Sequence, residues 1–147
     1  MAITRFAEAT WSGDLLSGSG LINYVSSGAF TRMPVTWASR TETHDGRTSP
    51  EELIASAHAS CFSMAFSGQL ARNGTPATRL DVRAVITFDK TDTGWRITRS
   101  DLTVRGKVSG IDSAKFVELA EAAKDGCPIS QALKGNVAFS VDAKLEG

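Results

Sequence analysis

The sequence SPEELIASAHASCFSMAFSGQLARNG, residues 49–74, contains the strongest helical signal in the chain. It opens with a capping box, Ser49–Glu52, in which a serine N-cap precedes a proline at the first helical position and two glutamates in the first turn. From Leu53 onward the residues are small or apolar on almost every face, a pattern typical of buried helices. The sequence therefore predicts a central helix over residues 50–72 that is packed on both sides.

The segment before this helix has the alternation and turn residues of β-structure. Strands are expected over the ranges Ile3–Trp11, Leu21–Ser26 and Met33–Arg40, separated by glycine-containing turns and followed by the polar loop Thr41–Ser49. A β-meander is the simplest arrangement of three such strands.

The segment after the helix alternates between strand and helix patterns. Two strands joined by an Asp-Thr-Gly turn precede a helix, a short helical turn that ends at Leu133, and a final strand; their ranges are Arg79–Phe88, Trp95–Val108, Asp112–Ala123, Cys127–Leu133 and Asn136–Leu145. The element order βββ-α-ββ-α-β predicts an α+β fold, in a single domain over residues 1–147.

Composition narrows the function classes. The 147 residues are 41% hydrophobic, and sixteen basic and sixteen acidic side chains give a formal charge of zero. A disordered chain and a basic nucleic-acid surface are therefore not expected. The first ten residues do not resemble a secretory signal, and the apolar stretch Leu53–Gly68 is shorter than the about 20 residues of a membrane span. We expect a cytoplasmic protein that binds no membrane.

The two cysteines, Cys61 and Cys127, have different sequence contexts. Cys61 lies midway along the predicted helix, where a free cysteine is often a small buried hydrophobic residue. Cys127 directly precedes Pro128, so its sulfur would face the unpaired N–H groups of a helix N-terminus, which favour a thiolate; the alternative is an ordinary loop cysteine. Together they are a plausible reactive pair, although spacing alone does not bring them together.

A metal site is a competing interpretation of the same residues. His44 and His58 complete a nominal set of two cysteines and two histidines, and His58 lies three residues before Cys61 on the helix. His44 and Cys127 lack the close paired spacing of structural zinc sites, so a zinc-dependent structural protein is the weaker hypothesis. For His58 we favour a hydrogen-bonded core position.

Several motifs together resemble the OsmC/Ohr family. TSPEELI at residues 48–54 followed by AHASCFSM at residues 57–64 is similar to the first family signature, and GCPISQAL at residues 126–133 is similar to the second. The opening WSGD at residues 11–14 and GID at residues 110–112 extend the resemblance over essentially the whole chain. No Gly-Gly-Arg-Asp-like motif stands near Gly13, which places the sequence nearer the OsmC branch than the Ohr branch.

This resemblance implies a fold and an activity. Family members are intertwined homodimers with two long helices at the centre, and they are thiol-dependent peroxidases that reduce organic hydroperoxides and, in the OsmC branch, hydrogen peroxide in defence against oxidative and osmotic stress. Cys61 matches the peroxidatic cysteine and Cys127 the resolving cysteine, which would form an intramolecular disulfide. An external dithiol, a lipoyl-protein or a small thiol, would reopen it. Such thiol chemistry requires no metal, flavin or haem, so no cofactor is expected.

The resemblance also implies a carboxylate and a guanidinium beside the reactive thiol. Glu51 matches the glutamate at the helix start, and Arg40 matches the activating arginine. An arginine stabilises a thiolate without losing its own proton, and a carboxylate fixes the guanidinium in a bidentate pair. The loop over residues 41–50 is one residue longer than in the OsmC pattern and contains Arg47, which is the alternative arginine. We favour Arg40 because it closes the strand predicted over residues 33–40.

Helix geometry separates Glu51 from Cys61. Ten residues of straight helix span about 15 Å, so the two side chains of one chain do not hold the same arginine. Two such helices packed antiparallel about a two-fold axis would bring Glu51 of one chain to Cys61 of the other. The expected site is therefore composite, with close approach allowed by Ala57, Ser60 and Ala65.

A non-enzymatic protein is the alternative function. In that case an OsmC-like fold would bind a small apolar ligand, and both cysteines would be buried and unreactive. Either function needs a largely apolar pocket. The segment Met33–Val35 is a candidate wall, whereas Phe62, Met64 and Phe66 are more typical of an ordinary core.

Overall fold

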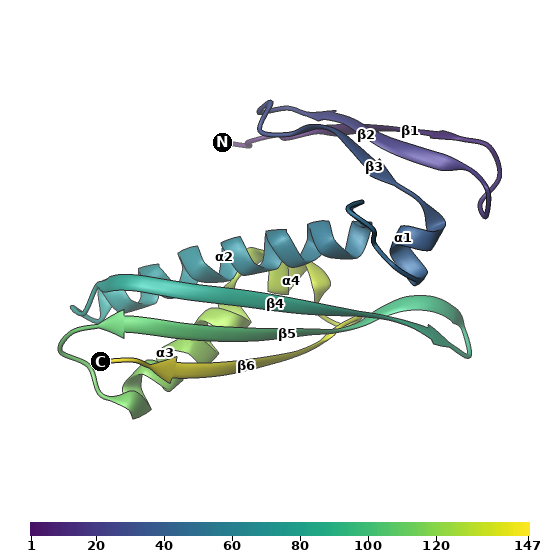
Figure 1. The fold of residues 1–147 in the computed structure, drawn as a ribbon. Coiled ribbons are helices and arrows are strands. Elements are labelled where there is room, and N and C mark those ends of the chain that lie inside the picture. Colours follow the sequence, from purple (N-terminus) through teal and green to yellow (C-terminus); the bar gives the residue numbers. More distant parts are fainter. The chain divides into compact units, whose positions relative to one another are not determined.

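The computed structural model describes all residues 1–147 as two compact units, Met1–Leu53 and Ile54–Gly147 (Figure 1). The boundary falls inside the long helix α2, Pro50–Arg72. Two three-stranded sheets and this helix confirm the predicted α+β class. Whether the units fold as one domain stays a prediction, and each is described by itself.

The N-terminal unit contains the predicted β-meander. Its strands β1 (Ala7–Ser12), β2 (Ser19–Val25) and β3 (Thr31–Val35) pair antiparallel in the order β1-β2-β3. Gly20 of β2 lies opposite Trp11, and a Cβ at this position would come within 2.7 Å of the Trp11 ring. The sheet therefore needs glycine there so that the indole can lie across the strand.

The predicted strand Met33–Arg40 is wrong in its second half. Strand β3 ends at Val35, and a short helix α1 occupies Trp37–Thr41. Thr36 is the N-cap of α1: its hydroxyl accepts from the backbone N–H of Ser39, and the Ser39 side chain accepts from the backbone N–H of Thr36. This reciprocal capping overrides the β-propensity of the segment, so Arg40 is positioned by a helix instead of a sheet.

Helix α2 has the predicted bounds but only one buried face. His58, Phe62, Phe66 and Leu70 recur every four residues and are fully buried. On the opposite face Ser56, Ser60 and Ser67 are exposed, and Met64 is 70% exposed. The expectation that the helix is packed on both sides is therefore not met within a single chain.

The C-terminal unit is a sheet with helices on one face. Strands β4 (Ala77–Thr91) and β5 (Gly94–Val108) form a long hairpin, and β6 (Ala138–Leu145) pairs parallel to β5. The crossover from β5 to β6 contains helices α3 (Ser113–Gly126) and α4 (Pro128–Leu133), as predicted from the sequence. Parallel pairing requires such a crossover.

The core of this unit lies between the sheet and its helices. Alternate residues of β5 turn toward α2 and α3 and are buried, and the Phe66 and Phe116 rings pack with centroids 4.9 Å apart. A Cβ at Gly106 would come within 2.6 Å of the Phe116 ring. The strand therefore needs glycine at this position to leave room for the aromatic side chain. The core cluster comprises Phe62, Phe66, Leu70, Leu102, Val104, Val108, Phe116, Ala120, Ala123 and Cys127.

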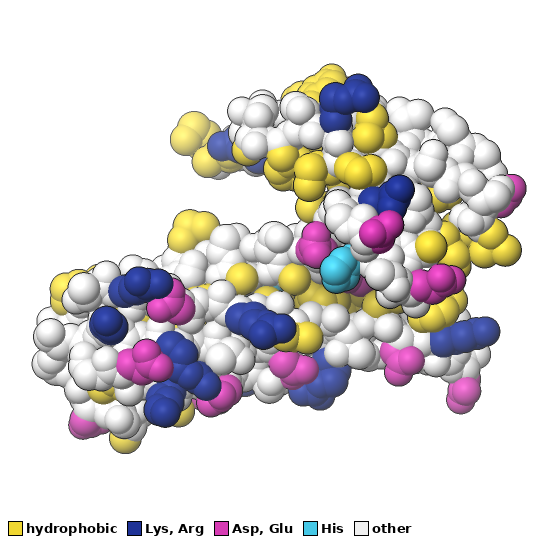
Figure 2. Space-filling view, in the orientation of Figure 1, with side chains coloured by type: hydrophobic (Ala, Val, Ile, Leu, Met, Phe, Trp, Pro, Cys, Tyr) yellow, Lys and Arg dark blue, Asp and Glu magenta, His cyan; other side chains and the backbone are white.

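Surface charge agrees with the balanced composition. Basic and acidic side chains are interspersed on the visible face of the C-terminal unit, without a continuous patch of one sign (Figure 2). None of the helices has the length and apolarity that crossing a membrane requires.

Candidate active site

Cys127 is held at a junction between two helices. Its backbone N–H donates to the carbonyl of Ala123 at the end of α3, and the same residue is the N-cap of α4, with Pro128 at the first helical position. The side chain is fully buried in the core. The predicted position at a helix N-terminus is therefore observed.

Cys61, on α2, lies near Cys127. Both cysteines are free, and the Cys127 thiol lies close enough to Cys61 to influence its pKa. The backbone N–H of Ile129, in the first turn of α4, also lies near the Cys61 sulfur. The structure thus brings together two residues that are separated by the whole β4–α3 segment.

The environment of Cys61 favours the neutral thiol. Burial raises the pKa of Cys61, and the adjacent Cys127 thiol raises it further, while the Ile129 N–H lowers it. A thiolate is the reactive form of cysteine. The protein therefore has to supply positive charge to this sulfur if Cys61 is to act as a nucleophile at neutral pH.

His58 is a hydrogen-bonded core residue, as the sequence favoured. Its Nδ1 lies 2.6 Å from the Ser100 hydroxyl of β5 and its Nε2 lies 2.8 Å from the Ser130 hydroxyl of α4. Burial lowers the pKa of His58, which keeps the ring neutral. The Phe139 ring of β6 packs edge-on against the imidazole at 5.6 Å.

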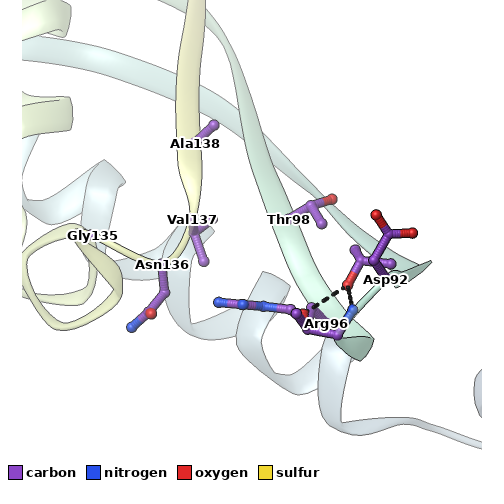
Figure 3. Close-up of a pocket in the computed structure, with 9 residues that line it drawn as sticks. Asp92, Arg96, Thr98, Gly135, Asn136, Val137 and Ala138 are labelled. Carbon is purple, nitrogen blue, oxygen red and sulfur yellow. Dashed lines mark hydrogen bonds between the residues drawn. The ribbon is translucent and has the colours of Figure 1, made fainter.

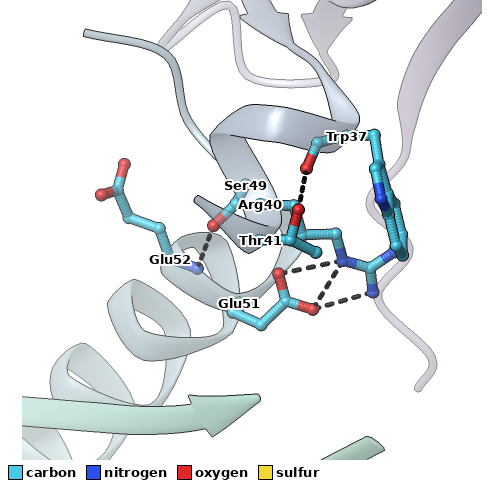
Figure 4. A network of polar contacts seen from close by, with 6 residues as sticks. All are labelled: Trp37, Arg40, Thr41, Ser49, Glu51 and Glu52. Atoms are coloured by element: carbon cyan, nitrogen blue, oxygen red, sulfur yellow. Dashed lines mark hydrogen bonds and ion pairs between the residues drawn. The ribbon is translucent and has the colours of Figure 1, made fainter. Parts of the chain in front are cut away.

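Arg40 and Glu51 form an ion pair within the N-terminal unit (Figure 4). The guanidinium of Arg40 donates from Nε to both carboxylate oxygens at 2.9 and 3.1 Å, and from Nη2 to Oε1 at 2.8 Å. Trp37, one turn earlier on α1, lies with its ring centroid 5.9 Å from the guanidinium carbon. The carboxylate fixes the guanidinium in the bidentate manner expected from the sequence.

Arg47, the alternative arginine, has a different environment. It lies in the turn after α1, where it pairs at 3.3 Å with Asp45, and both side chains are exposed. Exposed pairs of this kind contribute little to the orientation of a guanidinium. Of the two candidates, Arg40 is therefore the better held.

The metal hypothesis receives no support from the side-chain arrangement. No three or more histidine, cysteine or acidic side chains lie together in a way that could hold a metal ion. His58 uses both ring nitrogens on serine hydroxyls.

An apolar cavity of about 310 Å³ lies in the N-terminal unit beside Arg40. Of the proposed wall segment Met33–Val35, only Val35 lines it. Leu15, Thr36 and Trp37 are lining residues that the sequence did not single out. Its lining is Trp11, Leu15, Val35, Thr36, Trp37, Arg40 and Pro50. The capping pattern of residues 36–39 is the sequence signal that could have indicated this cavity. It starts a helix at Trp37, and Trp37 and Arg40, three residues apart, then lie on the same face of that helix.

A second cavity, of about 610 Å³, lies at the tip of the β4–β5 hairpin and the start of β6 (Figure 3). Arg96 points toward Asn136 there, and threonines of the hairpin complete the wall. None of the catalytic candidates Cys61, Cys127, Arg40 and Glu51 lines it.

The sequence-predicted residues therefore form two pairs, each inside its own unit: Cys61 with Cys127, and Arg40 with Glu51. Two small sheets, a long helix and a cysteine on that helix near a second cysteine define the class, which is an α+β protein with the OsmC-like fold.

Comparisons with known proteins identify the family. The profile of the family described as OsmC-like protein matches residues 43–142, so the chain belongs to the OsmC family. Peroxiredoxin OsmC of Escherichia coli (strain K12) is 39% identical over 144 residues, which cover 98% of this chain and 99% of the relative. The chain is thus a near full-length homologue of a peroxiredoxin, a cysteine-based peroxidase, as the motifs predicted.

More distant relatives agree with this placement. Organic hydroperoxide resistance protein OhrB of Bacillus subtilis (strain 168) is 32% identical over 101 residues, 67% of this chain and 68% of the relative. A crystal structure of an organic hydroperoxide resistance protein OsmC from Legionella pneumophila has the same fold, with a TM-score of 0.72 at 19% identity over 98% of this chain and 99% of that one.

Proposed function

We propose that this chain is a thiol-dependent peroxidase that reduces organic hydroperoxides and hydrogen peroxide through Cys61 and Cys127. The observation that carries the proposal is that the two free thiols lie near each other. The full-length similarity to a peroxiredoxin supports the same activity.

The reaction has three balanced steps. The Cys61 thiol loses its proton to solvent, and the thiolate attacks one peroxide oxygen, which breaks the O–O bond and forms a Cys61 sulfenic acid. The alkoxide or hydroxide that leaves takes up a proton from solvent and becomes an alcohol or water. The Cys127 sulfur then attacks the Cys61 sulfur, and the hydroxyl group leaves as water with the Cys127 proton. An external dithiol, such as a lipoyl-protein or a small thiol, finally reduces the disulfide and is itself oxidised.

Activation of Cys61 requires a cation, and Arg40 paired with Glu51 is the proposed source. The local surroundings of Cys61 raise its thiol pKa. Glu51 and Cys61 lie ten residues apart on α2, which corresponds to about 15 Å along the helix axis. We therefore assign the Arg40–Glu51 pair to the Cys61 of a partner subunit in a homodimer.

The uncovered face of α2 supports this homodimer. Small residues and the exposed Met64 form a face that a second copy of the helix can approach closely. Burial of such a surface is favourable by roughly 25 cal/mol for each Å² of apolar area. The proposed dimer would give α2 the second packed side that its composition predicts.

A subunit-mixing experiment tests the composite site. Cys61→Ser and Arg40→Ala are each expected to be inactive as homodimers. After co-refolding of equal amounts, about half of the dimers are hybrids, and each has one complete site if Arg40 acts across the interface, so about a quarter of wild-type activity returns. Mixtures that stay inactive while hybrids form would place the arginine and the cysteine in the same chain.

The cavity beside Arg40 is the proposed binding site for the alkyl group of an organic hydroperoxide. Two tryptophans and aliphatic side chains line it, and a guanidinium stands at its wall. An apolar pocket with one fixed polar group orients such a substrate with the peroxide toward the charge.

Thiol counting distinguishes this enzyme from a non-enzymatic protein that binds an apolar ligand in the same cavity. One equivalent of cumene hydroperoxide should remove two thiols per chain from the wild-type protein. Cys61→Ser should consume no peroxide, and Cys127→Ser should complete one oxidation and then accumulate over-oxidised Cys61. Unchanged thiols in the wild-type protein would favour the ligand-binding alternative.

A further inference from the structure

The buried His58 lies on α2, the helix that carries Cys61, and it contacts α4, whose N-cap is Cys127. Its ring bridges Ser100 of β5 at 2.6 Å and Ser130 of α4 at 2.8 Å, and all three side chains are almost completely buried. Neither the proposed chemistry nor the metal hypothesis uses this bridge. A buried polar network of this kind is costly unless each member is satisfied, and each member here is.

Residues on α2 and at the start of α4 pair twice with the same spacing: His58 with Ser130, and Cys61 with Cys127. His58 precedes Cys61 by three residues on α2, and Ser130 follows Cys127 by three residues at the start of α4. The His58–Ser130 hydrogen bond therefore lies one helical turn from the Cys61–Cys127 pair, between the same two elements.

Helix α4 is a short element; the Gln131 side chain ties it to α3, and the His58–Ser130 hydrogen bond ties it to α2. It has six residues, its N-cap makes no side-chain hydrogen bond, and Pro128 has no N–H to offer. Disulfide formation is geometrically demanding, since the sulfurs have to close to about 2.05 Å with a restricted dihedral angle. A small displacement of α4 would move both the Cys127 thiol and the Ile129 N–H away from Cys61.

We propose that His58 is a positioning residue for disulfide formation, and that it acts by holding Ser130, and with it α4, against the Cys61 turn of α2. This inference rests on the proposed Cys61–Cys127 disulfide. His58 touches neither the peroxide nor the reacting sulfurs. Its bond to Ser130 sets how often Cys127 meets the Cys61 sulfenic acid before a second peroxide molecule oxidises that sulfenic acid to sulfinic acid.

Two matched pairs of variants separate positioning from simple core stability. Ser130→Ala removes the bond to α4, whereas Ser100→Ala removes the equivalent bond on the opposite side of the same ring. His58→Gln places an amide near the former Nε2 and can still reach Ser130, whereas His58→Asn places it near the former Nδ1 and reaches only Ser100. Thermal unfolding should show comparable losses within each pair.

The readouts are the rate of disulfide formation after a single equivalent of hydroperoxide and the sulfinic acid fraction by intact mass at rising peroxide concentration. Ser130→Ala and His58→Asn should slow disulfide formation by about tenfold, the effect of losing one buried hydrogen bond, while Ser100→Ala and His58→Gln stay within about threefold of wild type. The first oxidation of Cys61 should be nearly unchanged in all four.

Equal rates in Ser130→Ala and Ser100→Ala, either both normal or both slow, would overturn the inference. If the His58 variants do not fold, the serine pair carries the test alone. A wild-type protein that forms no disulfide with hydroperoxide would instead refute the proposed function, so the two failures are distinguishable.

Discussion

Replacement of Glu51 by glutamine tests whether the Arg40–Glu51 pair serves catalysis. The carboxylate side chain is 9% exposed and the guanidinium 32% exposed, and three N–H to oxygen contacts of 2.8–3.1 Å join them. Glu51→Gln keeps the shape of the side chain but removes its charge and turns one acceptor into a donor that faces another donor.

The size of the effect follows from these contacts. Hydrogen bonds to charged groups contribute about 1.5–3 kcal/mol each, so the loss of one charge-assisted contact frees the guanidinium by that amount. If Arg40 stabilises the Cys61 thiolate only when it is held, kcat/KM for hydroperoxide should fall by roughly tenfold to a hundredfold. The KM for hydroperoxide should change less than kcat, because the substitution leaves the cavity proposed for the alkyl group intact.

The assay is steady-state reduction of cumene hydroperoxide with an excess of dithiol, and Glu52→Gln is the matched control. Glu52 occupies the same first turn of α2 and loses the same charge, but its side chain is exposed and accepts from the Thr48 hydroxyl at 2.9 Å. Equal losses of kcat/KM in Glu51→Gln and Glu52→Gln would refute the reasoning, since the cause would then be the helix dipole and not the ion pair.

Three further predictions concern assembly, pH and stability. Met64→Lys should convert the proposed homodimer to a single chain in light scattering, while Val117→Lys, also on an exposed helix position, leaves the mass unchanged. Burial depresses the pKa of His58 below its ordinary value of 6.5, so on acidification the unfolded chain binds this proton before the folded chain does. The free energy of unfolding should therefore fall as the pH drops below about 6.5, by up to about 1.4 kcal/mol per pH unit. Urea unfolding at pH 7.5 and 5.5 checks this, and His58→Gln should reduce the difference. Phe66→Ala leaves a cavity in a fully buried aromatic cluster and should lower the free energy of unfolding by about 3–5 kcal/mol, measured by urea titration; a loss below about 1 kcal/mol would contradict the assigned core.

Local chemistry made part of this fold predictable. The bounds of α2 follow from the serine cap and Pro50 at one end and Asn73-Gly74 at the other, because these residues act on the backbone beside them. The β4–β5 hairpin follows in the same way from alternation and its turn. The helix α1 was missed because the Thr36–Ser39 capping contact competes with a segment of high β-propensity, and propensity alone does not rank the two.

Contacts between distant residues were not available from spacing. Cys61 meets Cys127 because the crossover from β5 to β6 ends α3 at Gly126 and starts α4 against α2, and only the tertiary packing fixes that junction. Family motifs named the two cysteines, but the hydroxyl partners of His58 carry no motif signal. Serines at positions 100 and 130 look like ordinary strand and helix residues in the sequence.

The proposed homodimer would account for two features of the single chain, the raised pKa of Cys61 and the exposed face of α2. The Cys61 pKa is raised by its own unit, although the proposed reaction needs the thiolate, and the apolar α2 exposes a face with Met64, although its composition is that of a buried helix. A second copy packed on that face would bury the exposed methionine and, by antiparallel alignment of the two helices, bring a fixed guanidinium to each sulfur. In this proposed dimer the same contact would complete the packing of the core and the electrostatics of the site. Peroxidase activity would then depend on dimerisation, and a monomeric variant with full activity would contradict the proposed mechanism.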